Sequence, residues 1–164
     1  MKRIIAATLT VSVLLLTAKS QAAGYITLTN SDASGTNSFN TGLNWTNGLA
    51  PAKGNAYYTA NYTLRTPATA GNYAFAGDSL SLDSGGGMNL KAAGTITITN
   101  LILNGGTLAN GFGTGAIVAG NITNNGSSSK IDVQGYGRTT TINSPISGTG
   151  TLSLIHISEP TRPY

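Results

Sequence analysis

From residue 73 to residue 146 the chain alternates very short apolar runs with turn-forming residues. The pattern is clearest at residues 95–99, where threonine and isoleucine alternate as in a strand that buries one face. Segments rich in Gly and Asn, such as residues 85–87 and 124–126, separate the runs and tolerate the positive φ angles of sharp turns. Because no segment after Ala22 has capped helical periodicity, the pattern predicts an all-β protein.

The apolar runs recur at an interval of about 20 residues, a period typical of solenoid repeats. Leu80, Ile102, Ile122 and Ile142 follow one another at this nearly constant spacing. An interval of this size with three short strands inside it is expected for one coil of a parallel β-helix, and a coil must stack on its neighbours to bury its apolar face. We therefore expect these four residues to form one column in a β-solenoid of three to four coils over residues 72–151. An antiparallel β-sandwich, with strands at closer spacing, is the alternative.

Residues 1–22 have the pattern of a secretory signal peptide. Lys2 and Arg3 precede an apolar run from residue 4 to residue 16, and small residues follow at Ser20 and Ala22. The run is too short to cross a bilayer as a helix. The pattern predicts an exported protein with no membrane span in the mature chain.

Residues 152–164 differ in composition from everything before them. Residues 152–162 read LSLIHISEPTR, which resembles the translation of a transposase adapter used in short-read DNA sequencing. We interpret residues 152–164 as a sequencing-adapter remnant. Because apolar residues cover exposed strand edges, we expect Leu154, Ile155 and Ile157 to pack on the open end of the last coil.

The net charge and the set of reactive side chains are different once residues 1–22 and 152–164 are left out. The whole chain has a net charge of +4, but residues 23–151 hold five Lys and Arg against four Asp, and they contain no Cys, His or Glu. This balance removes the support for a nucleic-acid or anionic-membrane partner. A metal site built on His or Cys is excluded there, and no cofactor is expected.

Residues 23–71 hold the bulky aromatic side chains and are expected to cap the solenoid. They include Trp45, Tyr57, Tyr58 and Tyr62. These rings could plug the N-terminal end of the coils, or they could form a stacking platform for sugar rings. The flanking prolines favour the plug, and glycan binding by the four residues remains the functional alternative.

The charged residues offer little for catalysis. Asp78 and Asp83 flank one strand, but five residues of strand place them on opposite faces, so Asx turn capping is expected instead. Asp132, with Lys130 and Arg138, comes nearest to a polysaccharide-lyase site. We expect Arg65 and Arg138 to cover surface or pair with Asp. No catalytic residue is assigned.

Several phrases resemble a known family. Asn-Trp-Thr-Asn-Gly at residues 44–48, Phe-Ala-Gly-Asp-Ser-Leu at 75–80, the stretch 100–106 and Ile-Ser-Gly-Thr-Gly at 146–150 resemble secreted Gram-negative proteins with autotransporter-associated β-strand repeats. The likeness covers residues 38–151. It implies a right-handed parallel β-helix that serves as a stalk, adhesin or passenger at the extracellular or outer-membrane surface.

Two classes of function follow. The first is a secreted or cell-surface β-solenoid scaffold that contacts an extracellular surface or glycan through many weak polar contacts. The second is the N-terminal part of a β-helical carbohydrate-active enzyme, a polysaccharide lyase or glycosidase, whose catalytic residues lie downstream. A stand-alone glycan-binding module would instead depend on Trp45 or Tyr58.

Overall fold

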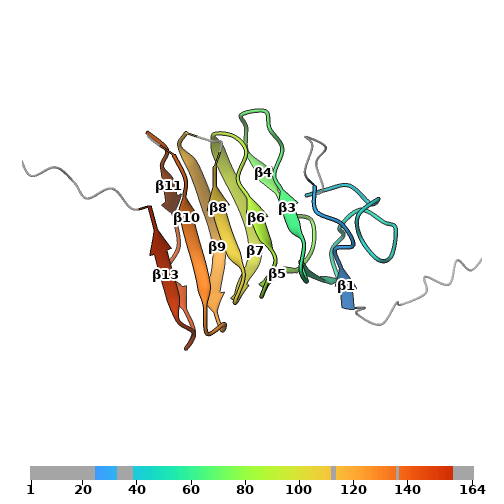
Figure 1. Ribbon diagram of the computed structural model, residues 1–164. Helices are drawn as coiled ribbons and strands as arrows, with labels where there is room; N and C mark the ends of the chain where they lie inside the picture. Colours follow the sequence, from blue (N-terminus) through green and yellow to red (C-terminus); the bar gives the residue numbers. More distant parts are fainter. Residues whose placement is uncertain (1–24, 33–38, 112–113, 136, 157–164) are drawn as a thin grey trace, which may run out of the picture.

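The computed structural model describes residues 25–32, 39–111, 114–135 and 137–156, and every strand pairing between its named strands is parallel (Figure 1). The described residues contain no helix, so none that could cross a membrane. The all-β parallel solenoid is confirmed, with about four turns. Residues 1–24, which include the expected signal peptide, lie outside the described residues.

Two sheets form the sides of the solenoid. The eight-stranded sheet has the order β1-β2-β5-β7-β9-β11, with β4 beside β7 and β12 beside β9. Its strands are β1 (Tyr25–Thr27), β2 (Ala56–Tyr58), β4 (Tyr73–Ala74), β5 (Ser79–Asp83), β7 (Gly94–Asn104), β9 (Ala116–Asn124), β11 (Thr140–Ile142) and β12 (Ile146–Ser147). The five-stranded sheet, in the order β13-β10-β8-β6-β3, holds β3 (Thr63–Arg65), β6 (Gly87–Asn89), β8 (Thr107–Asn110), β10 (Ser129–Val133) and β13 (Leu152–Ile155).

Successive coils place equivalent apolar residues in register. Leu80 pairs with Leu101, and Leu101 pairs with Ile122, each step being one coil. In the five-stranded sheet Met88 pairs with Leu108, again one coil later. The interval at which the apolar runs recur is therefore the coil length, as predicted.

The predicted column of Leu80, Ile102, Ile122 and Ile142 is wrong in two members. Ile102 pairs with Ser81 and Thr123, one position away from the inward column. Ile142 pairs with Val118 in β9 and belongs to a separate column. The error has a physical cause. β7 and β9 each run along two sides of a coil, and their pairing has a register shift between the two sides. Leu101 and Ile102 are equally apolar, so composition does not show which of them faces inward.

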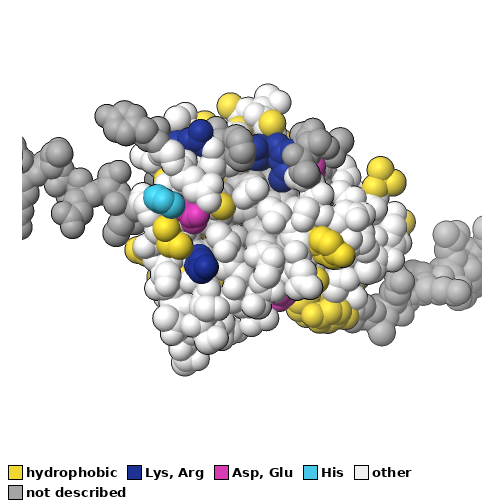
Figure 2. Space-filling model, viewed as in Figure 1, with side chains coloured by type: hydrophobic (Ala, Val, Ile, Leu, Met, Phe, Trp, Pro, Cys, Tyr) yellow, Lys and Arg dark blue, Asp and Glu magenta, His cyan; other side chains and the backbone are white. Residues whose placement is uncertain are grey.

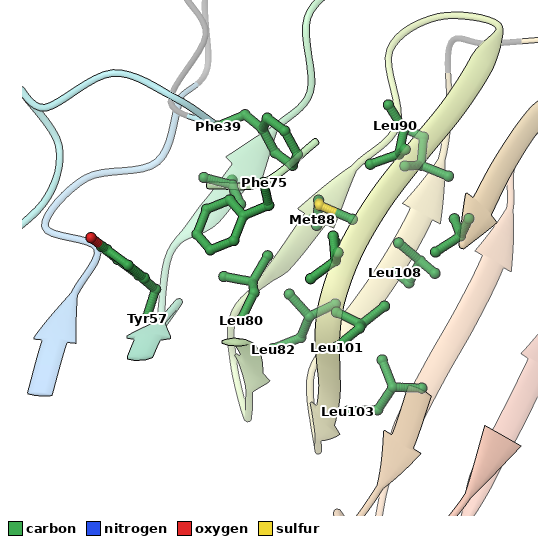
Figure 3. Packing of buried hydrophobic residues seen from close by; sticks show 14 of the residues in the cluster. Phe39, Tyr57, Phe75, Leu80, Leu82, Met88, Leu90, Leu101, Leu103 and Leu108 are labelled. Carbon is green, nitrogen blue, oxygen red and sulfur yellow. The ribbon is translucent and has the colours of Figure 1, made fainter. Parts of the chain in front are cut away.

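The core is a ladder of aliphatic side chains closed at one end by aromatic rings (Figure 3). The ring centroids of Trp45 and Tyr57 are 4.9 Å apart, and those of Phe39 and Phe75 are 5.4 Å apart. Each fully buried Leu or Ile contributes about 1.5–3 kcal/mol to the free energy of unfolding. The buried aliphatic residues of the core cluster are Ile26, Leu28, Leu64, Leu80, Leu82, Met88, Leu90, Ile96, Ile98, Leu101, Leu103, Leu108, Ala116, Val118, Ile122 and Ile131.

Both ends of the chain add strands to the same sheets. The expected N-terminal cap supplies β1, β2 and β3, which continue the two sheets as well as carrying the aromatic rings. At the other end β13 pairs with β10, so Leu154 and Ile155 lie on the edge of the last coil as predicted, although the Leu154 side chain stays 55% exposed. Ile157 lies outside the described residues.

Candidate functional site

A groove lies on the outer face of the five-stranded sheet. Because Leu64, Met88 and Leu108 point into the core, the residues on either side of them point outward. The groove has a volume of about 250 Å³ and is lined by Thr63, Gly85, Gly86, Gly87, Met88, Asn89, Thr107, Ala109 and Gln134. Hydroxyl and amide side chains supply its polar groups.

A glycine forms the floor of this groove. Thr63, Gly87 and Thr107 are in register across β3, β6 and β8. A Cβ on Gly87 would collide with the carbonyl oxygen of Thr107, so no other residue fits there without a shift of the backbone. The backbone of Thr107 therefore packs directly against Gly87 at the base of the groove.

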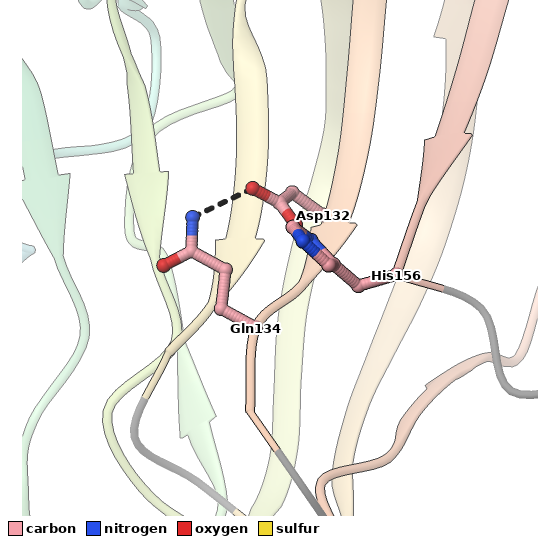
Figure 4. Close-up of polar contacts among 3 residues, drawn as sticks. All are labelled: Asp132, Gln134 and His156. Carbon is pink, nitrogen blue, oxygen red and sulfur yellow. Dashed lines mark hydrogen bonds and ion pairs between the residues drawn. The ribbon is translucent and has the colours of Figure 1, made fainter.

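Asp132 lies beside the groove with both carboxylate oxygens engaged (Figure 4). Gln134 Nε2 donates a hydrogen bond to Asp132 Oδ2 at 2.6 Å, and Nδ1 of His156 lies 2.7 Å from Asp132 Oδ1. Burial raises the pKa of Asp132, but these two hydrogen bonds and the nearby charges of His156 and Lys130 lower it overall. At neutral pH the group is a carboxylate that accepts hydrogen bonds and does not act as a general acid.

Three cations, Arg65, Lys91 and Arg138, form what we call the basic edge. The Arg65 guanidinium lies 3.8 Å from the Asp32 carboxylate, which confirms the expected pairing of an arginine with Asp. The pKa of Lys91 is lowered by burial and then by the charges of Arg65 and Arg138, while Asp32 acts in the opposite direction. Figure 2 shows Lys and Arg side chains gathered along the upper edge of the molecule.

Of the four aromatic residues predicted as a glycan site, two are buried and two are accessible from the surface. Trp45 is 2% exposed and Tyr57 is fully buried, so their rings belong to the plug and are not presented to a ligand. Tyr62 is on the surface, and Tyr58 stacks on Tyr25 with ring centroids 3.9 Å apart.

Tyr25 offers the most accessible ring of this group, at 70% exposure. It is not recognisable from sequence as a partner of Tyr58, because their contact depends on the pairing of β1 with β2. The exposed aromatic surface at this end therefore consists of the Tyr25–Tyr58 stack and the Tyr62 ring.

The two carboxylates around β5 have different surroundings. Asp83 accepts hydrogen bonds from the backbone N–H of Ala60 at 3.0 Å and from the Ser81 hydroxyl at 2.7 Å. The first joins two coils and the second lies within β5, so neither is the expected Asx hydrogen bond to a backbone N–H of the same turn. Asp78 is exposed.

The lyase-like cluster is assembled only in part. Lys130 and Asp132 both lie on the outer face of β10, on either side of Ile131, whereas Arg138 folds over Gly111 and Gly135 in the basic edge. Within the part of the chain that the structure describes, no group of three or more His, Asp or Glu side chains could hold a metal ion. The site can bind through hydrogen bonds and charge.

Comparison of the chain with protein-family models, with curated proteins and with solved structures gave no match.

Proposed function

We propose that the chain is part of a secreted or cell-surface β-solenoid scaffold of the adhesin type, which makes extracellular contacts along its sides. The observation that supports this most strongly is the repetition of outward polar side chains from coil to coil. Asn121 Nδ2 donates to Asn100 Oδ1 at 3.3 Å, and Asn100 Nδ2 donates to the carbonyl oxygen of Asp78 at 2.8 Å. This ladder presents an asparagine side chain at the same position of two successive coils.

The mechanism is geometric. Parallel coils that share one continuous core resist bending, because each coil contacts its neighbours along both sheets. Weak polar contacts on several coils then engage together, and their combined affinity exceeds that of any single contact. A surface with repeated hydroxyl or carboxyl groups is the matching partner.

The enzyme alternative is supported by one observation, the Asp132 carboxylate beside the groove. One of its oxygens is engaged by Gln134, and Asp83 is held by the Ala60 N–H of the preceding coil. Glycoside hydrolysis normally uses two cooperating carboxyl groups. The scaffold proposal therefore accounts for more of the described side chains.

Binding and cleavage separate the two functions. The chain without residues 1–22 is added to bacterial and host cell surfaces and to soluble polysaccharides, and both retention and released product are measured. Retention without cleavage is the expected result. Cleavage overturns the scaffold proposal, and a failure to bind any of the surfaces overturns the adhesive role.

Export has its own test. Residues 1–22 are fused to a reporter that is active only outside the cytoplasm, with a matched fusion in which Lys2 and Arg3 are changed to Glu. We expect activity with the native segment and its loss in the variant, because the basic start directs signal-peptide insertion. An inactive native fusion contradicts secretion.

A further inference from the structure

We propose that the outer face of the eight-stranded sheet binds an uncharged polysaccharide, which lies along the solenoid axis with one sugar ring stacked on Tyr25. This inference rests on the proposed extracellular function and names the class of partner.

The parallel register places outward side chains in two rows that cross the coils. Because Ile26, Tyr57 and Leu80 are buried, the residues on either side of them point outward. One row follows the pairing from β1 to β12 and holds Thr27, Tyr58, Ser81, Ile102, Thr123 and Ser147. The other lies two positions earlier in each strand and holds Tyr25, Ala56, Ser79, Asn100 and Asn121. We call these two rows the outer strip.

Tyr25 supplies an open ring at one end of the outer strip. It stacks on Tyr58 with 21° between the ring planes, and it is nevertheless 70% exposed. Since the stack covers one face of the Tyr25 ring, the exposed surface includes the opposite face. Hydrophobic side chains gather on the surface at the end of the molecule where β1 lies (Figure 2). A tyrosine ring held in this way offers a flat contact to a sugar ring at little cost in side-chain entropy.

The rest of the outer strip supplies hydrogen-bonding groups. Asn121 Nδ2 donates to Asn100 Oδ1 at 3.3 Å, and the hydroxyl oxygens of Thr123 and Ser147 lie 3.5 Å apart. A side-chain amide has two donor hydrogens and an acceptor oxygen, so each asparagine keeps groups with which to bind a ligand. Hydroxyl and amide groups match sugar hydroxyls in both donor and acceptor roles.

The charge of the outer strip favours an uncharged sugar over an anionic one. Neither row contains Asp, Glu, Lys or Arg. Asp78, which is exposed and precedes Ser79 in the chain, adds a negative charge at the margin that would repel a carboxylate or a sulfate. Ile102 is the only aliphatic side chain larger than Ala in the two rows, which leaves little apolar surface for the core of a protein interface.

The coil spacing suits a linear polymer. Neighbouring strands of a sheet lie about 4.8 Å apart, so the steps from β1 through β2, β5 and β7 to β9 span about 19 Å. One ring of an extended β-1,4-linked sugar chain advances by about one strand spacing. Successive rings therefore meet successive coils, and several weak contacts add up along one polymer.

The test is a calorimetric titration of the chain without residues 1–22 at neutral pH. The ligands are β-1,4-linked hexasaccharides of glucose and of N-acetylglucosamine, with a hexamer of galacturonic acid as the anionic comparison. We expect at least one uncharged hexasaccharide to bind with an affinity that added salt leaves unchanged, and the galacturonate hexamer to bind more weakly.

Matched variants locate the site. Tyr25→Ala removes the ring, Tyr25→Phe keeps it, and Tyr62→Ala removes an exposed ring outside the outer strip. We expect Tyr25→Ala to weaken binding about tenfold, while Tyr25→Phe and Tyr62→Ala have little effect. Asn121→Ala should weaken binding of the hexasaccharide several-fold, because it removes an amide four strands away from Tyr25 in the sheet order. Thermal unfolding verifies that all variants fold.

Three results overturn the inference. Equal weakening by Tyr25→Ala and Tyr62→Ala shows that binding does not depend on the outer strip. Preferential binding of the galacturonate hexamer, abolished by salt, shows attraction by charge. If the chain adheres to cell surfaces but binds neither uncharged hexasaccharide, the inference fails while the proposed function stands, and adhesion that survives periodate oxidation of the surface sugars then identifies a protein partner. If the chain binds a hexasaccharide through Tyr25 but adheres to no surface, the adhesive function fails instead.

Discussion

Asp83 and Ala60 are joined by a hydrogen bond between adjacent coils, in which the backbone N–H of Ala60 donates to Asp83 Oδ2 at 3.0 Å. Ala60 has a φ of 50°, a left-handed conformation that alanine rarely adopts. The same carboxylate accepts a hydrogen bond from Asn104 Nδ2, one coil later in the chain, at 3.1 Å. One carboxylate thus connects three successive coils at a corner of the solenoid.

Asp83→Ala is expected to lower the free energy of unfolding by about 2 kcal/mol, because it leaves the Ala60 N–H without its charged acceptor. Urea unfolding followed by circular dichroism measures the change. Asp78→Ala is the matched control, since Asp78 is exposed, and it should alter stability by less than about 0.5 kcal/mol. Equal effects of the two substitutions would show that the corner does not depend on Asp83.

Leu101→Ala and Ile102→Ala test the register of the core. Leu101 is 1% exposed between Leu80 and Ile122, so its truncation should cost about 3 kcal/mol of unfolding free energy. Ile102 points outward beside Ser81 and Thr123, and its truncation should cost about 1 kcal/mol or less. A larger loss at Ile102 than at Leu101, measured by the same urea titration, would restore the column expected from spacing alone.

The coil length was readable from sequence because burial of one strand face imposes alternation, and stacking imposes a repeat. The alignment of individual residues could not be predicted from sequence, because an inserted residue at a bulge moves side chains to the other face of the strand without changing the composition. Ile142 illustrates this, because its partner Val118 lies on a different side of the coil from Ile122.

The site was less accessible to sequence than the fold. The aromatic cluster at Trp45 indicated a plug, but nothing local to Tyr25 reveals its contact with Tyr58. The groove depends on Gly87 being in register with Thr63 and Thr107, residues more than one coil apart. Sites assembled by stacking become visible only once the register is known.

Gly94→Ala should be far more damaging than Gly54→Ala. Gly94 has a φ of 120°, and a Cβ there would collide with the carbonyl oxygen of Gly71 in the preceding coil. Gly54 has a φ of 87° with nothing within 4 Å of a Cβ, so alanine there meets only conformational strain of about 1–2 kcal/mol. We expect Gly94→Ala to unfold at a clearly lower temperature than Gly54→Ala. Similar melting temperatures would mean that the coils can separate to accept a methyl group.

Acid should destabilise the chain partly through Asp132. The folded state holds the pKa of Asp132 below its ordinary value of 3.8, so the carboxylate contributes stability above that pH. This contribution is lost as the pH falls below 3.8 toward the lower folded pKa, because the unfolded state then binds the proton more readily. The drop in urea midpoint between neutral and acidic pH should be smaller in Asp132→Asn than in the native chain.

A chain that ends at Thr151 separates the contributions to this pH effect. It lacks His156, which both hydrogen-bonds Asp132 and adds positive charge when protonated, but it keeps Gln134 and Lys130. Its acid-induced loss of stability should therefore lie between those of the native chain and Asp132→Asn. If Asp132→Asn loses as much stability as the native chain, the acid sensitivity does not come from Asp132.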